Sequence, residues 1–112
     1  MILGTTLKKG PFYDIMRNNP IFITMKSRLQ FITTGVMAES IETLLRKSLT
    51  REIVNVGGVG TFNFANIKKY FSQAIQISPK AETQIYEMNV EKLRRLYPKL
   101  KTSEEYLHDF LG

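Results

Sequence analysis

Tyr97 and Lys101 have a spacing that is known from proton-transfer sites. In a helix, a lysine one turn after a tyrosine lies beside it and lowers the pKa of the phenol. Pro98 directly follows the tyrosine and interrupts the helix that would bring the two side chains together. The sequence therefore favours structural roles for both residues, and it predicts no catalytic residue.

The glycines of Gly58-x-Gly60-x-x-Asn63 form a second pattern with possible chemistry. Glycines before a helix let the backbone approach a pyrophosphate at the helix N-terminus, as in dinucleotide-binding loops. The third glycine of such a loop is missing, and no strand-helix-strand unit that would hold a cofactor precedes it. A tight turn with positive φ values is the favoured interpretation.

Basic side chains near the N-terminus alternate with aromatic residues and suit the binding of phosphate groups. The bases are Lys8, Lys9, Lys26 and Arg28, and the nearby aromatic residues are Phe12 and Phe31. A solvated basic rim explains the same residues equally well, and the local sequence leaves both interpretations open.

The charge of the whole chain points to an anionic partner. Its 16 Lys and Arg residues exceed its 10 Asp and Glu residues, and most of the excess falls in residues 1–51. This charge supports the alternative of a small basic nucleic-acid-binding protein. In it, Arg46, Lys47 and Arg51 would contact phosphate groups together with basic residues nearer the N-terminus. The excess is modest, however, and no helix combines bases with groove-reading polar residues.

The remaining composition excludes several classes of protein. There is no cysteine, so disulfides and thiolate metal sites are impossible, and the single histidine, His108, is expected on the surface rather than at a metal. No stretch is long and apolar enough to span a membrane or to act as a signal peptide. We expect one soluble cytoplasmic domain over residues 1–112, with no metal site.

Hydrophobic periodicity and capping residues predict short strands alternating with helices. The expected helices are 11–18, 36–47, one capped by Thr61 over residues 64–71, 90–96 after Asn89, and one capped by Ser103. The expected strands are 21–24 and 29–34, as a hairpin or as neighbours, then 52–56, 74–77 and 83–88. The fold class is therefore mixed α/β, with about four to five helices.

Four of these segments together resemble the extended short-chain dehydrogenase/reductases. LQFITTGVMAESI (residues 29–41) resembles the family's R-x-(Y/F)-I-x-V-x-D-(V/L)-A-x-A segment, and IVNVGG (53–58) resembles its (I/V)-Y-N-(I/V)-G-(G/S) strand. YEMNVEKLRRL (86–96) and SEEYL (103–107) resemble its last two helices. The order and spacing identify the chain as similar to the C-terminal, substrate-binding part of NAD-dependent sugar-nucleotide epimerases and dehydratases.

The resemblance implies a nucleoside diphosphate sugar as ligand. It implies that Arg28 contacts the diphosphate, although Arg28 lies three residues before Phe31 where the family has two, and that Lys80 stands near a second phosphate-binding position. Val36 occupies the family's usual aspartate position. Together with the local chemistry, this gives Arg28, Phe31, Lys8, Lys9 and Lys80 as candidate substrate-binding residues.

The family's Rossmann half, which binds NAD(P) and carries the catalytic residues, has no counterpart in this sequence. The resemblance therefore implies no cofactor and no activity for this chain by itself, NAD(P) for a full-length parent, and the missing half as a partner. The expected strand 52–56 and the helix face of Phe62, Phe64 and Phe71 would then lack their covering elements. We expect a homo-oligomer in which strands pair or swap between copies.

Overall fold

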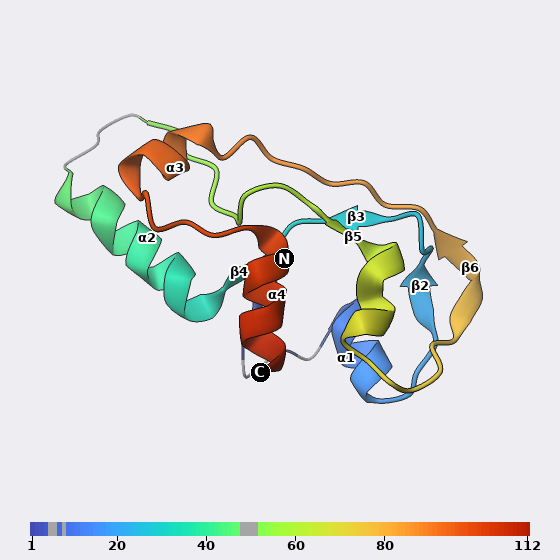
Figure 1. Cartoon of the computed structure of the whole chain (residues 1–112). Helices are drawn as coiled ribbons and strands as arrows, with labels where there is room; N and C mark the ends of the chain where they lie inside the picture. Colours follow the sequence, from blue (N-terminus) through green and yellow to red (C-terminus); the bar gives the residue numbers. More distant parts are fainter. Residues whose placement is uncertain (5–6, 8, 48–51) are drawn as a thin grey trace.

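The computed structural model describes residues 1–4, 7, 9–47 and 52–112. Within them, short strands alternate with four α-helices and one 3-10 helix (Figure 1). The elements are β1 (Ile2–Leu3), α1 (Pro11–Met16), β2 (Ile21–Ile23), β3 (Arg28–Leu29), β4 (Ile32–Thr33), α2 (Thr34–Arg46), β5 (Phe62–Asn63), η1 (Phe64–Lys69), β6 (Ile77–Glu82), α3 (Glu91–Leu96) and α4 (Ser103–Leu111). The expected mixed α/β class is confirmed.

The strands of the described residues form three separate pairs rather than one sheet. β1 pairs with β4 and β2 pairs with β6, both in parallel, whereas β3 and β5 are antiparallel. The predicted hairpin of residues 21–34 is therefore wrong, because β2 finds its partner more than 50 residues later in the chain.

Two hydrophobic clusters form the core, one on each side of α4. Phe12, Phe31 and Leu107 belong to the first cluster, together with α1, β2 and η1. Ile32 and Tyr106 belong to the second, against α2 and α3. Phe31 and Ile32, at the start of β4, and Tyr106 and Leu107, in α4, are consecutive residues that face opposite clusters. Figure 1 shows α4 between the two ends of the molecule.

Local sequence explains the two longest helices. Glu42 and Arg46 form the expected i,i+4 ion pair near the end of α2. α4 begins with a capping box in which Thr102 accepts a hydrogen bond from the Glu105 backbone N–H and the Glu105 carboxylate accepts one from the Thr102 N–H. The cap is therefore Thr102, one residue before the predicted Ser103, whose side chain has another role.

The chain between α2 and β6 differs most from the predictions. Residues 52–56 belong to no strand and no helix, so the predicted strand is wrong. Thr61 caps no helix; the chain first adds β5, and Asn63 then caps η1 by accepting a hydrogen bond from the Ala65 N–H. The predicted strands 74–77 and 83–88 are replaced by β6, which includes Pro79.

The expected open face of Phe62, Phe64 and Phe71 is also wrong. Phe62 and Phe64 have at most 1% of their surface exposed, and Phe71 stacks on Phe12 with ring centroids 6.4 Å apart. These rings fill the first cluster because η1 folds back over α1, so they need no second chain to cover them.

Candidate functional site

Arg28 lies in the middle of three adjacent backbone segments. On one side it pairs with Asn63 of β5. On the other, its N–H donates to the Gln84 carbonyl oxygen over 2.9 Å, and its carbonyl oxygen accepts from the Tyr86 N–H over 3.1 Å, so that Ile85 lies beside it. Paired residues of adjacent strands project to the same side, so the side chains of Asn63, Arg28 and Ile85 form one row.

This row is exposed, whereas the next residue along each paired strand is buried. Leu29 and Phe62, which pair with each other, point into the first cluster. Ile85 is 69% exposed, and Arg28 and Asn63 are exposed as well. The Arg28 guanidinium makes no ion pair with any described acidic residue. The two backbone hydrogen bonds fix where the Arg28 side chain starts, and its planar guanidinium can donate two parallel hydrogen bonds to a phosphate group.

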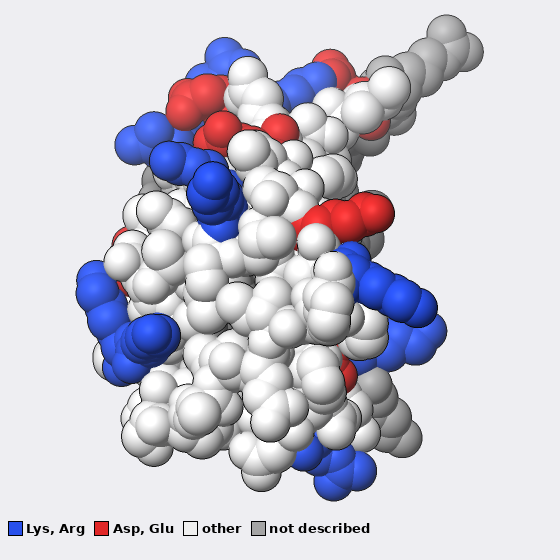
Figure 2. Space-filling view, turned by 90° about the vertical axis from the view of Figure 1, so that its right-hand side faces the viewer, with Lys and Arg blue, Asp and Glu red and all other residues white. Residues whose placement is uncertain are grey.

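The other predicted site residues are dispersed. Phe31 has no exposed surface, and its ring meets that of Phe12 edge-on at 5.0 Å, so in this structure it contributes packing. Lys9 and Lys80 are exposed, Lys80 on β6, and Lys8 lies outside the described residues. Figure 2 shows Lys and Arg side chains in separate groups around a largely uncharged centre on the face that it draws.

The glycine turn packs against its own chain. The Gly58 N–H donates to the Phe31 carbonyl oxygen over 2.8 Å, and a Cβ on Gly58 would lie 2.3 Å from that oxygen. Gly60 has a φ of 69°, in the left-handed region. The favoured tight-turn interpretation fits these contacts, since the space next to Gly58 is filled by backbone rather than open to a phosphate.

Two buried polar side chains, Gln30 and Ser103, hold this turn, a role that the sequence analysis did not predict for either. The Gln30 amide donates to the carbonyl oxygens of Gly58 and Met88, and its oxygen accepts from the Met88 N–H over 2.7 Å. The Ser103 hydroxyl donates to the Gly60 carbonyl oxygen and accepts from the Phe31 N–H. For Gln30 the local signal was a polar residue between the apolar Leu29 and Phe31, and Ser103 was assigned as a helix cap instead, because the partners of both side chains are distant in sequence.

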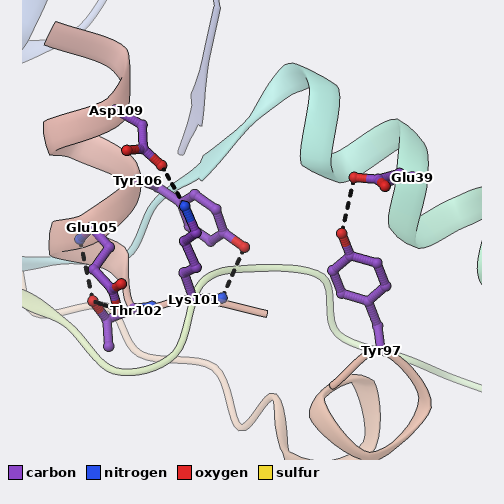
Figure 3. A network of polar contacts seen from close by, with 7 residues as sticks. All are labelled: Glu39, Tyr97, Lys101, Thr102, Glu105, Tyr106 and Asp109. Atoms are coloured by element: carbon purple, nitrogen blue, oxygen red, sulfur yellow. Dashed lines mark hydrogen bonds and ion pairs between the residues drawn. The ribbon is translucent and has the colours of Figure 1, made fainter. Parts of the chain in front are cut away.

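Tyr97 and Lys101 point to different partners (Figure 3). The Tyr97 hydroxyl donates to the Glu39 carboxylate over 2.9 Å, whereas the Lys101 ammonium pairs with Asp109 at 3.1 Å. Burial, followed by the hydrogen bond to Glu39, raises the pKa of Tyr97 to about 12, the opposite of what a general base needs. The structural role predicted for the pair agrees with this geometry.

The described residues offer few other groups that could bind a metal ion or take part in catalysis. They contain no group of three or more His, Asp or Glu side chains arranged to hold a metal ion. His108 is exposed, as expected, with its ring 6.3 Å from that of Tyr70. None of the described helices has the length and apolar content that crossing a membrane requires.

No protein-family model matches the sequence, and a comparison with curated proteins also finds no match. Among solved structures, the fold is similar to that of a UDP-galactose 4-epimerase, with a TM-score of 0.66 and 20% sequence identity. The similarity covers 98% of this chain and 41% of the epimerase chain. This chain therefore has the fold of a fragment of an epimerase, and it spans less than half the length of that enzyme.

Proposed function

We propose that this chain is the nucleoside diphosphate sugar-binding part of an epimerase- or dehydratase-like protein and is catalytically inactive by itself. The observation that carries the proposal is the fold similarity to a UDP-galactose 4-epimerase along 98% of the chain. The sequence motifs add that the matching part is the C-terminal one, in which such proteins hold their substrate.

Arg28 is the proposed diphosphate contact. It combines an exposed guanidinium, no competing carboxylate among the described residues, and a backbone whose N–H and carbonyl oxygen are both hydrogen-bonded, to Gln84 and Tyr86. Asn63 and Ile85 flank it and offer an amide and an apolar surface to the rest of the ligand. Lys80 and Lys9 are exposed cations that extend the attraction for phosphate, each as a weaker contact.

The proposal assigns the chemistry to a part that the described residues do not supply. They include no paired tyrosine and lysine and no open glycine loop, so a Rossmann half would have to bring NAD(P) and the catalytic residues. Because part of the ligand's contacts would also come from that half, binding to this chain alone is expected to be weak.

Titration calorimetry with UDP-galactose tests the proposal. We expect weak binding to the wild type that is detectable as heat. Arg28→Ala is expected to reduce the affinity about tenfold or more, since a hydrogen bond to a charged group contributes about 1.5–3 kcal/mol. Arg95→Ala is the matched control, because Arg95 is also an exposed arginine without an ion pair among the described residues. Equal affinities of Arg28→Ala and wild type would remove Arg28 from the site.

Two further ligands separate this proposal from its alternatives. NAD is expected to give no heat with the chain alone. Micromolar NAD binding would contradict the assignment of cofactor binding to another part. Duplex DNA is expected to bind weakly, because the basic groups do not form one continuous stripe on the face drawn in Figure 2. Tight DNA binding with a steep salt dependence would favour the nucleic-acid alternative instead.

A further inference from the structure

We propose that the pocket between the end of α1 and the chain that leads into β6 binds a small neutral polyol ring, such as a monosaccharide or a cyclitol. The pocket has a volume of about 240 Å³ and shares no residue with the row of Asn63, Arg28 and Ile85. Its lining includes four carboxamide side chains and two isoleucines: Asn18, Asn19, Gln73, Gln76, Ile15 and Ile75. This site lies apart from the proposed diphosphate contact and takes a ligand without phosphate.

The end of α1 positions two of the carboxamides. Asn18 has a φ of 57°, in the left-handed region. Its N–H donates to the Ile15 carbonyl oxygen over 3.1 Å, and the Asn19 N–H donates to the Asp14 carbonyl oxygen over 2.8 Å. These two bonds form the Schellman motif that closes many helices. They fix the backbone from which the side chains of Asn18 and Asn19 reach the pocket.

The chain before β6 supplies the other two carboxamides. The Gln73 amide donates to the Ile15 carbonyl oxygen over 3.2 Å, which ties this segment to the end of α1. The Gln76 carbonyl oxygen accepts from the Ile21 N–H over 2.8 Å, which ties the same segment to β2. Figure 1 shows α1 and the chain leading into β6 at the lower edge of the molecule, and β3 near its upper edge.

The lining of the pocket is polar but uncharged. Four other surface pockets of the described residues each include at least one acidic or basic side chain, whereas this one includes none. An ionic ligand would lose water here without gaining an opposite charge. A carboxamide offers a donor beside an acceptor, and a hydroxyl group can be either, so four carboxamides suit a ligand with several hydroxyl groups. Hydrogen bonds within the described part of the chain occupy one of the four, that of Gln73.

The size and the apolar part of the lining fit a single ring. Ile15 is 2% exposed and Ile75 is half-buried, so they give the pocket an aliphatic surface that the C–H groups of a polyol ring can contact. The volume lies below the ~300–1,000 Å³ that is usual for larger ligands. The described residues place no aromatic ring in the lining, which disfavours a nucleobase, because bases gain affinity by stacking.

Nitrogen–proton correlation NMR tests the site, since each Asn and Gln side-chain NH₂ group gives signals of its own. The probes are galactose and myo-inositol. The NH₂ signals of Asn18, Asn19 and Gln76 are expected to shift and to saturate, with a dissociation constant in the millimolar range, because a few neutral hydrogen bonds carry the affinity. Unchanged signals at high ligand concentration, or shifts spread evenly over the exposed amides of the chain, would overturn the proposal.

Two exposed glutamines provide a matched pair of variants. The carbonyl oxygens of Gln76 and Gln84 both accept a backbone hydrogen bond from a neighbouring segment, but only Gln76 lines the pocket. Gln76→Ala is expected to raise the dissociation constant about two- to tenfold, the range of one neutral hydrogen bond. Gln84→Ala is expected to leave it unchanged. Equal effects of the two substitutions would show that the ligand does not bind in this pocket.

A variant at the end of α1 probes the opposite wall. Asn18→Gly removes one carboxamide and keeps the helix end, because glycine adopts a positive φ freely. It is expected to weaken binding about two- to tenfold with the backbone signals of α1 in place. Ala74→Leu fills the pocket from an exposed position and is expected to abolish the shifts. Full galactose binding by Ala74→Leu would contradict the assignment.

Arg28→Ala separates this pocket from the proposed diphosphate contact. The variant is expected to lose affinity for UDP-galactose in calorimetry but to keep the shifts that galactose causes at Asn18, Asn19 and Gln76. Loss of those shifts would place the ring beside Arg28 and contradict a separate pocket. Inorganic phosphate is expected to leave the NH₂ signals of the pocket unchanged, because its lining has no cation. Larger shifts with phosphate than with galactose would contradict a neutral ligand.

Discussion

Replacing Gly58 with alanine should destabilise the fold far more than its one added methyl group suggests. The new Cβ would lie 2.3 Å from the Phe31 carbonyl oxygen, and at 3.0 and 3.1 Å from the backbone N and Cα of Ser103. All three neighbours are backbone atoms, held in place by β4, which follows Phe31, and by the start of α4. They cannot rotate away as a flexible side chain would.

The cost can be estimated from the contacts that must break. Moving the turn away loses the hydrogen bond from the Gly58 N–H to the Phe31 oxygen and leaves buried polar groups without partners, at about 1–3 kcal/mol. The overpacking itself costs about 1–3 kcal/mol. Together these give roughly 2–6 kcal/mol, against a total stability of about 6–17 kcal/mol at ~0.05–0.15 kcal/mol per residue.

Urea unfolding followed by far-ultraviolet circular dichroism measures this cost, and the midpoint should fall while the slope stays constant. Gly35→Ala is the matched control, because nothing lies within 4 Å of the added Cβ and Gly35 lies inside α2. That variant should be stabilised by up to about 1 kcal/mol, since alanine favours a helix. A loss below about 1 kcal/mol for Gly58→Ala would show that the turn is not tightly packed against the strand.

Three further outcomes are expected. Ser103→Ala should cost about 2–3 kcal/mol in urea unfolding, because it leaves the Phe31 N–H and the Gly60 carbonyl oxygen without their partner. Thr102→Ala should cost about 1 kcal/mol through loss of the capping box, with Thr102→Ser close to wild type. Because the pKa of Tyr97 is raised from 10.0 to about 12, the folded chain keeps the phenol proton that the unfolded chain releases. Stability should therefore fall as the pH rises through this interval, and less steeply in Tyr97→Phe.

The helices could be predicted from sequence because their signals are local. In α2, the apolar spacing and the Glu42–Arg46 pair all lie within the 13 residues that form the helix. In α4, a threonine and a glutamate three residues later form the capping box. The error at Ser103 has the same origin: a serine beside a threonine offers two caps, and only the distant contacts of Ser103 with residues 31 and 60 decide between them.

The strand pairing could not be predicted because it depends on which segments the core brings together. β2 and β6 pair although no short turn connects them, and Pro79 lies within β6, which has only one paired side among the described strands. Arg28 was predicted as a site residue from its charge, but its position between β5 and residues 84–86 depends on contacts with two later parts of the chain. The exposed row of Asn63, Arg28 and Ile85 was therefore not visible in the sequence.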